Sequence, residues 1–87
     1  MSDRSNEIVF RLPAGVPQPK FGFFQSVQFE ADWGEIIGVQ YVAPYSAWAE
    51  KLGIGWHYVV ELAPASPAAQ TVSVAVVDEL ALEAWTG

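Results

Sequence analysis

Apolar and polar residues alternate with a period of two in several short segments after residue 20. In 55–62, for example, Trp56 and Tyr58 fall on one face and the polar residues between them fall on the other. This period is typical of a strand with one buried face. The pattern predicts strands at 23–31, 35–42, 55–62 and 70–77, and a last short strand at 80–85.

Glycine and aspartate residues indicate how these strands connect and bend. Asp32-Trp33-Gly34 predicts a turn, because aspartate favours turn starts and glycine accepts positive φ. Gly38, inside the second strand, predicts a bulge. Asp78-Glu79-Leu80 predicts one helical turn ahead of the last strand, since acidic residues are favourable at a helix N-terminus.

The segment 44–52 has a different period. Its apolar residues recur at the spacing of one helical face: Tyr45, Trp48, Ala49 and Leu52. Pro44 suits the first helical turn, and Gly53 suits the position just after a helix. We predict a short helical insert that packs through this face, because so short a helix is not stable alone.

The N-terminal residues 1–20 form an arm of another character. Ile8, Phe10 and Leu12 alternate with polar residues, which predicts an extra strand at 7–12. Three prolines follow within seven residues and cannot continue a strand ladder. The sequence therefore predicts an arm with a Pro-rich connector over 1–20 and one compact domain over 21–87.

Length and composition set the size of the fold. The chain has 87 residues, of which 52% are hydrophobic and none is cysteine. It supports one modest core without disulfides or cysteine-bound metals. Short strands at this spacing favour a sandwich or barrel, and closure of a barrel removes sheet edges. We predict an all-β fold, a small barrel of about five antiparallel strands with the helical insert at 44–52.

Four short motifs lie along the predicted strands: Phe24-x-x-Val27-x-Phe29, Gly34-Glu35-Ile36-Ile37-Gly38, Trp56-x-Tyr58-x-Val60 and Val77-Asp78-Glu79-Leu80. Together they resemble small uncharacterised SH3-like barrel proteins of the kind common in cyanobacteria, over residues 21–85. Gln25-Ser26 departs from the Gly-Asp that many such barrels carry. The resemblance implies an SH3-like barrel, a class of domain that usually binds peptides, proteins or nucleic acids and is rarely an enzyme. It implies no particular site residue.

The charge of the chain argues against two classes of partner. Four Lys and Arg residues stand against ten Asp and Glu residues, which gives a net charge of −6. Nucleic-acid binding needs basic side chains to neutralise phosphates, and an anionic membrane surface repels an acidic chain. The acidity fits a basic segment of a partner protein. It equally fits a role in keeping a Trp-rich surface soluble.

One hypothesis places a metal-binding or enzymatic site around His57, the only histidine. Its partners would be Glu61 or the turn acids Glu30, Asp32 and Glu35. Along one strand, however, His57 and Glu61 lie about 13 Å apart, and the acids match no calcium-loop spacing. We therefore predict no enzymatic activity, no cofactor and no metal.

The aromatic content is the most unusual feature, with four Trp and three Tyr in so short a chain. A small barrel encloses only part of them, and exposed aromatic residues anchor binding patches. The leading hypothesis is a non-enzymatic protein-interaction module with an acidic-rimmed aromatic groove for a basic or proline-containing segment. The predicted groove residues are Trp33, Tyr41, Tyr45, Trp48 and Trp56. For Tyr41, Trp56 and Tyr58, packing inside the core is the alternative.

A structural role is the second hypothesis. The alternating segment 7–12 could pair with the sheet edge of a second copy and give a homodimer. The polar N-terminus has no hydrophobic block behind it, and no apolar run reaches the roughly 18 residues of a membrane span. We therefore expect a cytoplasmic protein without signal peptide or membrane helix.

Overall fold

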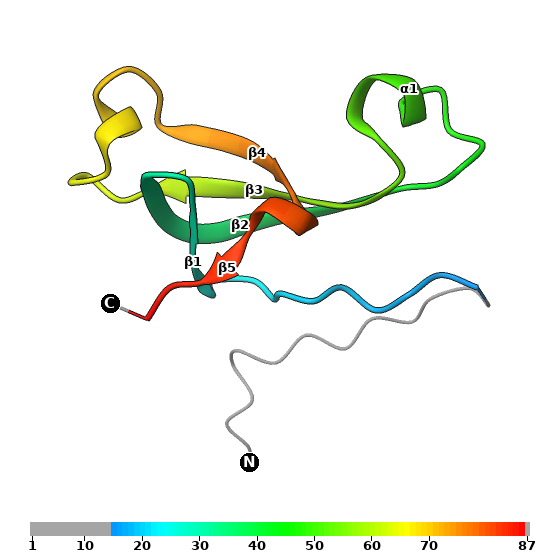
Figure 1. Cartoon of the computed structure of the whole chain (residues 1–87), viewed down its shortest axis with the longest axis horizontal. Coiled ribbons are helices and arrows are strands. Elements are labelled where there is room, and N and C mark those ends of the chain that lie inside the picture. Colours follow the sequence, from blue (N-terminus) through cyan, green and yellow to red (C-terminus); the bar gives the residue numbers. More distant parts are fainter. Residues whose placement is uncertain (1–14, 87) are drawn as a thin grey trace, which may run out of the picture.

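The computed structural model describes residues 15–86, which build one antiparallel sheet of five strands in the order β4-β3-β2-β1-β5 (Figure 1). The strands are β1 (Ser26–Phe29), β2 (Asp32–Val42), β3 (Gly55–Leu62), β4 (Val74–Asp78) and β5 (Glu83–Ala84). Three short helical turns connect them: α1 (Ala49–Leu52), η1 (Pro67–Gln70) and η2 (Glu79–Ala81). The all-β prediction is confirmed. The strand predicted at 7–12 lies outside the described residues.

Several local predictions agree with the structure. The strand predicted at 55–62 is β3, and the register of β2 on β3 shifts between Ile36 and Gly38, as expected for a bulge. The helical turn predicted after β4 is η2, and Asp78 caps it by accepting a hydrogen bond from the Leu80 amide at 2.9 Å. β1, β4 and β5 are shorter than predicted. Turns lie on both sides of β1, whereas η1 lies ahead of β4 and η2 lies ahead of β5.

The turn predicted at Asp32-Trp33-Gly34 is wrong by two residues. Phe29 pairs with Asp32, so the hairpin turns at Glu30 and Ala31, and Glu30 takes a positive φ of 54°. Asp32 and Gly34, the residues that predicted the turn, instead make contacts with parts of the chain that are distant in sequence. The Asp32 carboxylate accepts hydrogen bonds from the loop after β3, and a side chain at position 34 would overlap the backbone of that strand.

The sheet is not closed into a barrel, which corrects that part of the fold prediction. Within residues 15–86, β4 pairs only with β3, and β5 pairs only with β1. β5 has two residues and is too short to reach the opposite edge. Phe21 from the connector and Leu82 from the segment after η2 cover the core, in place of further strand pairs.

The core lies on one face of this sheet. Alternate residues of β3 point into it, and Tyr58 and Val60 are completely buried. Val27 of β1 and Ile36 of β2 meet them from the neighbouring strands. Within residues 15–86 no helix is long and apolar enough to cross a membrane.

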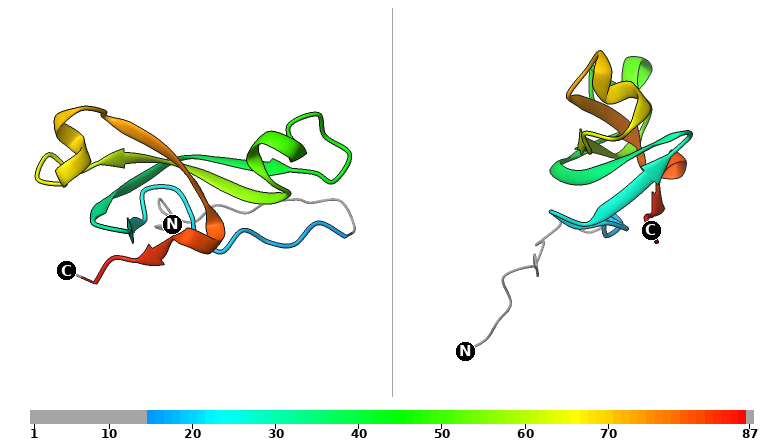
Figure 2. Two further views of the ribbon diagram at one scale, coloured as in Figure 1. Left: turned by 45° about the horizontal axis from the view of Figure 1, so that its top comes forward. Right: turned by 90° about the vertical axis from the view of Figure 1, so that its left-hand side faces the viewer.

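The segment between β2 and β3, residues 43–54, projects from one end of the sheet, and we call it the 43–54 excursion (Figures 1 and 2). Its helix is α1, only four residues long, and none of those residues is buried. The prediction that the insert packs through its apolar face is therefore wrong. Gly53 does end the helix as predicted, with a φ of 88° that favours glycine.

Candidate interaction surface

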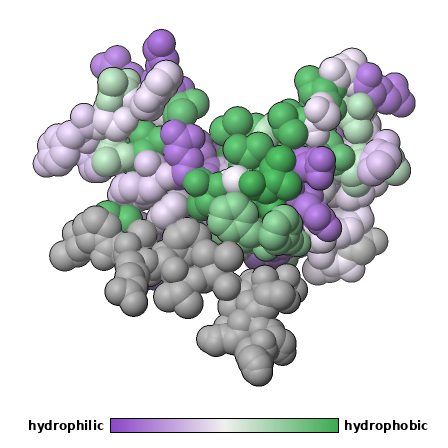
Figure 3. All heavy atoms as spheres, turned by 180° about the vertical axis from the view of Figure 1, so that it is seen from behind, coloured by the Kyte–Doolittle hydropathy of each residue, from purple (hydrophilic) through white to green (hydrophobic). Residues whose placement is uncertain are grey.

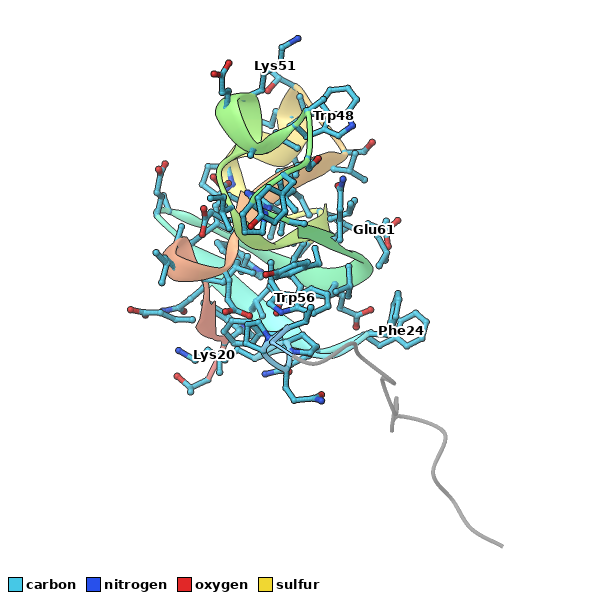
Figure 4. All side chains as sticks on the ribbon, turned by 90° about the vertical axis from the view of Figure 1, so that its right-hand side faces the viewer. Lys20, Phe24, Trp48, Lys51, Trp56 and Glu61 are labelled. Carbon is cyan, nitrogen blue, oxygen red and sulfur yellow. The ribbon has the colours of Figure 1, made fainter. Side chains whose placement is uncertain are left out.

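Large apolar side chains gather in the 43–54 excursion and are open to solvent. Tyr45 is 97% exposed, Ile54 is 58% exposed and Trp48 is 55% exposed. Leu52 is also exposed. Figure 4 shows Trp48 and Lys51 at this end of the molecule, away from Trp56. The arrangement leaves an apolar surface at the tip of the sheet that nothing in the described chain covers.

A buried histidine holds the base of the excursion. His57 of β3 is 3% exposed, and its Nε2 atom lies 2.6 Å from the carbonyl oxygen of Leu52. Its Nδ1 atom lies 3.3 Å from the carbonyl oxygen of Gly55, and Asp78 Oδ2 lies 3.7 Å from Nε2. The ring therefore bridges the strand and the end of α1, where two main-chain oxygens and the Asp78 carboxylate surround its nitrogens.

The excursion carries charge of both signs. Glu50 and Lys51 are both exposed, and the Lys51 ammonium lies 5.8 Å from the centre of the Trp48 ring. This distance suits a cation–π contact, which at an exposed site contributes about 0.5–1 kcal/mol. Lys51 therefore favours one orientation of the indole while leaving much of the ring exposed.

Tyr41 and Trp56 lie at the foot of the excursion and contact each other. They are partners in the pairing of β2 with β3, and their ring centres are 5.1 Å apart at an angle of 56°. Trp56 is only 7% exposed, and its indole N–H donates to the Pro17 carbonyl oxygen at 2.9 Å. The connector thus occupies the polar edge of this indole.

Trp33 lies at the opposite end of β2. Its ring stacks on Trp85 with centres 5.1 Å apart and planes within 6° of parallel. Eight residues of strand separate it from Tyr41, which corresponds to about 26 Å. The structure therefore brings Tyr41 into contact with Trp56. Tyr45 and Trp48 both belong to the excursion, whereas Trp33 lies apart from the other four. The five rings do not line one groove.

Asp32, one of the acids of the predicted turn, is engaged in hydrogen bonds. Its Oδ1 atom accepts hydrogen bonds from the Ser66 hydroxyl at 2.5 Å and from the Ala68 amide at 2.8 Å. These two donors hold the pKa of Asp32 below its usual value of 3.8. Within residues 15–86, no three His, Cys, Asp or Glu side chains gather closely enough to share a metal ion.

A hydrogen-bonded group that the sequence does not reveal joins the connector to the sheet. The Tyr58 hydroxyl donates to Glu79 Oε2 at 2.5 Å and accepts from the amides of Lys20 and Phe21. Burial, followed by the hydrogen bond to Glu79, raises the pKa of Tyr58 to about 12. These residues are far apart in sequence, so no spacing pattern could have indicated the contact.

A second apolar surface lies on the sheet itself. Ile37, Val74 and Val76 are exposed, and Val76 is opposite Val59 in the pairing of β3 with β4. Figure 3 shows hydrophobic residues concentrated over the middle of the molecule, between its two ends. An exposed aromatic residue lies close to it, because Phe24 is 59% exposed and its amide donates to the carbonyl oxygen of Ile36, the residue before Ile37.

A cleft of about 440 Å³ lies at the end of the sheet away from the excursion. It is lined by Gly34, Glu35, Glu61 and Pro64, among others. Glu35 and Glu61 face each other in the pairing of β2 with β3, and like charges in this position repel. Because the cleft lies at the opposite end of the sheet, it is separate from the exposed rings of the excursion.

Comparison with protein-family models, with curated proteins and with solved structures finds no match for this chain.

Proposed function

We propose that this chain is a non-enzymatic protein-interaction module that binds another protein or a peptide through its 43–54 excursion. The exposure of Tyr45, Trp48 and Ile54 together on one short excursion carries the proposal. A group of exposed apolar side chains with charged neighbours is typical of a contact surface. Tyr and Trp are also the residue types that contribute most to binding when a partner buries them.

The charge of the molecule supports a basic partner. The net charge is −6, although within the excursion the charge of Glu50 is balanced by that of Lys51. The overall acidity of the molecule favours a partner with Lys or Arg around its own apolar residues. A proline-containing segment is a suitable ligand, because proline is already extended and packs on flat aromatic rings.

The contacts of the only histidine support a role other than catalysis. Both ring nitrogens of His57 face main-chain carbonyl oxygens, those of Leu52 and Gly55. A general base must instead reach a proton on a substrate. We assign His57 the task of holding the excursion in place.

We also propose that the fold is SH3-like. Five short antiparallel strands in a small chain, the bulge at Gly38 and the 3-10 turn η2 ahead of the last strand support this assignment.

Affinity capture from the native host tests the proposed function. The bait proteins are the wild type and the double variant Tyr45→Ser/Trp48→Ser, and bound proteins are quantified by mass spectrometry. The expected result is at least one partner retained by the wild type and lost by the double variant. With the purified partner, the double variant is expected to bind at least about tenfold more weakly, since loss of a central aromatic costs about 2 kcal/mol or more.

Two control variants make this experiment specific. Leu80→Ser alters a side chain that is 94% exposed on η2 and is expected to retain the partner. Val76→Thr alters the aliphatic surface of the sheet with little change in shape. Loss of the partner with Val76→Thr, together with its retention by the double variant, would refute the assignment to the excursion.

A further inference from the structure

β4 forms one edge of the sheet, and its outer side is open along the length of the strand (Figure 1). It pairs with β3 from Val74 to Asp78 without a shift of register, and within residues 15–86 no other strand pairs with it. The opposite edge is β5, which has only two residues. β4 is therefore the longer of the two edges to which a further strand can add.

The hydrogen bonds between β3 and its neighbour show which residues of β4 face outward. The Leu62 amide donates to the Ser73 carbonyl oxygen at 3.0 Å, so the main-chain groups of residue 73 point toward β3. These directions alternate along an antiparallel strand. The N–H and C=O groups of Val74 and Val76 therefore point away from β3, and within residues 15–86 they have no hydrogen-bond partner.

β4 lacks the features that usually protect an edge strand from further pairing. It contains no Lys, no Pro and no bulge. Val74 is 44% exposed and Val76 is 58% exposed, and both alternate with the buried Val77, so their side chains project from the face of the sheet opposite the core. An extended segment placed against β4 would bond to these two residues and cover their side chains with its own.

The charges around this edge favour a basic occupant. Residues 55–82 contain no Lys or Arg, and their three acids are Glu61, Asp78 and Glu79. Glu61 is exposed and lies opposite Val74, whereas Asp78 ends β4 itself with its side chain 46% exposed. Both acids share the face of Val74, because directly paired and alternate residues point to one side of a sheet. A second copy, with its own net charge of −6, would be repelled.

We propose that the free edge of β4 binds an extended, basic segment of another protein as an added antiparallel strand. The main chain of the segment exchanges N–H to C=O hydrogen bonds with Val74 and Val76, which provide the affinity. The segment carries β-branched residues opposite these two valines and a Lys or Arg opposite Asp78. The 43–54 excursion contributes none of these residues, so this site is independent of the proposed function.

Hydrogen exchange of single amides, followed by NMR on the full chain, tests the proposal. The probe is the end-blocked peptide Lys-Thr-Val-Thr-Val-Thr-Lys, which places valine opposite Val74 and Val76 and lysine opposite Asp78. With the peptide at about ten times its dissociation constant, the Val74 and Val76 amides are expected to exchange about tenfold more slowly than in the free chain. The amides of Ala75 and Val77, which by the alternation bond to β3, are expected to be slow in both states.

Two control peptides separate the main-chain contribution from the charge. N-methylation of both valines removes the donors that face β4 but keeps every charge, and replacement of both lysines by glutamate reverses the charge but keeps the strand-forming residues. Each change is expected to weaken binding about tenfold or more. Equal binding of either control peptide would overturn the proposal. Slow exchange of the Val74 and Val76 amides in the free chain would also overturn it, because the edge would then already be paired.

Substitutions in the chain give an independent test. Val76→Pro removes the outward N–H group, which an edge strand tolerates because that group faces solvent, and is expected to weaken peptide binding about tenfold or more. Val76→Thr keeps the N–H group and is expected to leave the dissociation constant within about twofold. Equal effects of these two substitutions would overturn the proposal. Tyr45→Ser/Trp48→Ser is expected to bind the peptide as the wild type does, so this test and that of the proposed function fail separately.

Discussion

The Nε2 atom of His57 lies 2.6 Å from the carbonyl oxygen of Leu52, so a buried strand residue fixes the end of the exposed excursion. The contact explains how a helix of one turn keeps its place although no side chain of α1 is buried. A surface that is already ordered loses less conformational entropy when a partner binds. By holding the excursion in place, the His57 contact therefore favours the proposed binding function.

We predict that His57→Ala loosens the excursion. The substitution leaves the Leu52 carbonyl without its imidazole partner and removes buried volume, so a loss of about 2–3 kcal/mol in unfolding free energy is expected. Urea unfolding measures this loss. Native-state hydrogen exchange is expected to accelerate at the Lys51, Leu52 and Gly53 amides, which bond within α1.

The matched control for this prediction is Gln40→Ala. Gln40 is directly opposite His57 in the pairing of β2 with β3, but its side chain is exposed. A change of no more than about 0.5 kcal/mol is expected. If hydrogen exchange in α1 stays at the wild-type rate in His57→Ala, the histidine does not hold the excursion.

Local periodicity predicted the centre of the sheet well, because β3 is a long strand whose period reflects one buried face. Closure of a barrel depends instead on pairing between the two edge strands, β4 and β5, and the two-residue β5 gives no local signal for that. The turn signals at Asp32 and Gly34 misled for a related reason. Asp32 bonds to Ser66 and Ala68 in the loop after β3, and Gly34 allows the backbone of β3 to approach closely. Both contacts join residues far apart in the sequence.

The exposure of the aromatic residues could likewise not be predicted from the local sequence. Trp48 and Trp56 are of one residue type, yet one is largely exposed and the other is nearly buried. The difference arises because the connector covers Trp56, whereas nothing in residues 15–86 covers the excursion. Composition correctly suggested that some rings remain exposed, but only the arrangement of the chain determines which ones.

The Tyr58 hydroxyl makes the stability of the protein sensitive to alkaline pH. Its pKa is about 12 in the folded state and near 10.0 in the unfolded chain. Between these values the unfolded state has released the proton and the folded state has kept it, so stability falls as pH rises. The contribution is fully present below about pH 10 and is lost toward pH 12.

Urea unfolding midpoints at several pH values between about 8 and 11 measure this effect. Tyr58→Phe is expected to be less stable at neutral pH by about 1–3 kcal/mol, because the Phe21 amide loses its hydrogen-bond acceptor and the Lys20 amide and the Glu79 carboxylate each lose one of their two partners. It is also expected to show a shallower decline above pH 10. Parallel curves for the two proteins would show that Tyr58 does not titrate in this way.

Asp32 makes the stability of the folded protein sensitive to acidic pH. Its folded pKa lies below the usual 3.8, because Ser66 and Ala68 donate hydrogen bonds to the carboxylate. The stabilisation is therefore present above about pH 4 and is lost as pH falls through the folded pKa. Asp32→Asn keeps an oxygen acceptor but does not titrate, so its acid unfolding curve is expected to be flatter below pH 4. An unchanged acid slope would contradict this assignment.

Two glycines of β2 are expected to differ sharply in their tolerance of a methyl group. Gly34 pairs with Leu62, and a Cβ atom there would overlap the backbone carbonyl of Glu61, which cannot move without breaking the pairing of β2 with β3. At Gly38 a Cβ atom would lie 3.1 Å from the side chain of Val59, which can shift by a few tenths of an ångström. Gly34→Ala is therefore expected to cost about 3 kcal/mol or more, and Gly38→Ala about 1 kcal/mol. Thermal and urea unfolding of the two variants measure the difference, and equal stabilities would show that the close approach of the two strands at Gly34 does not limit the fold.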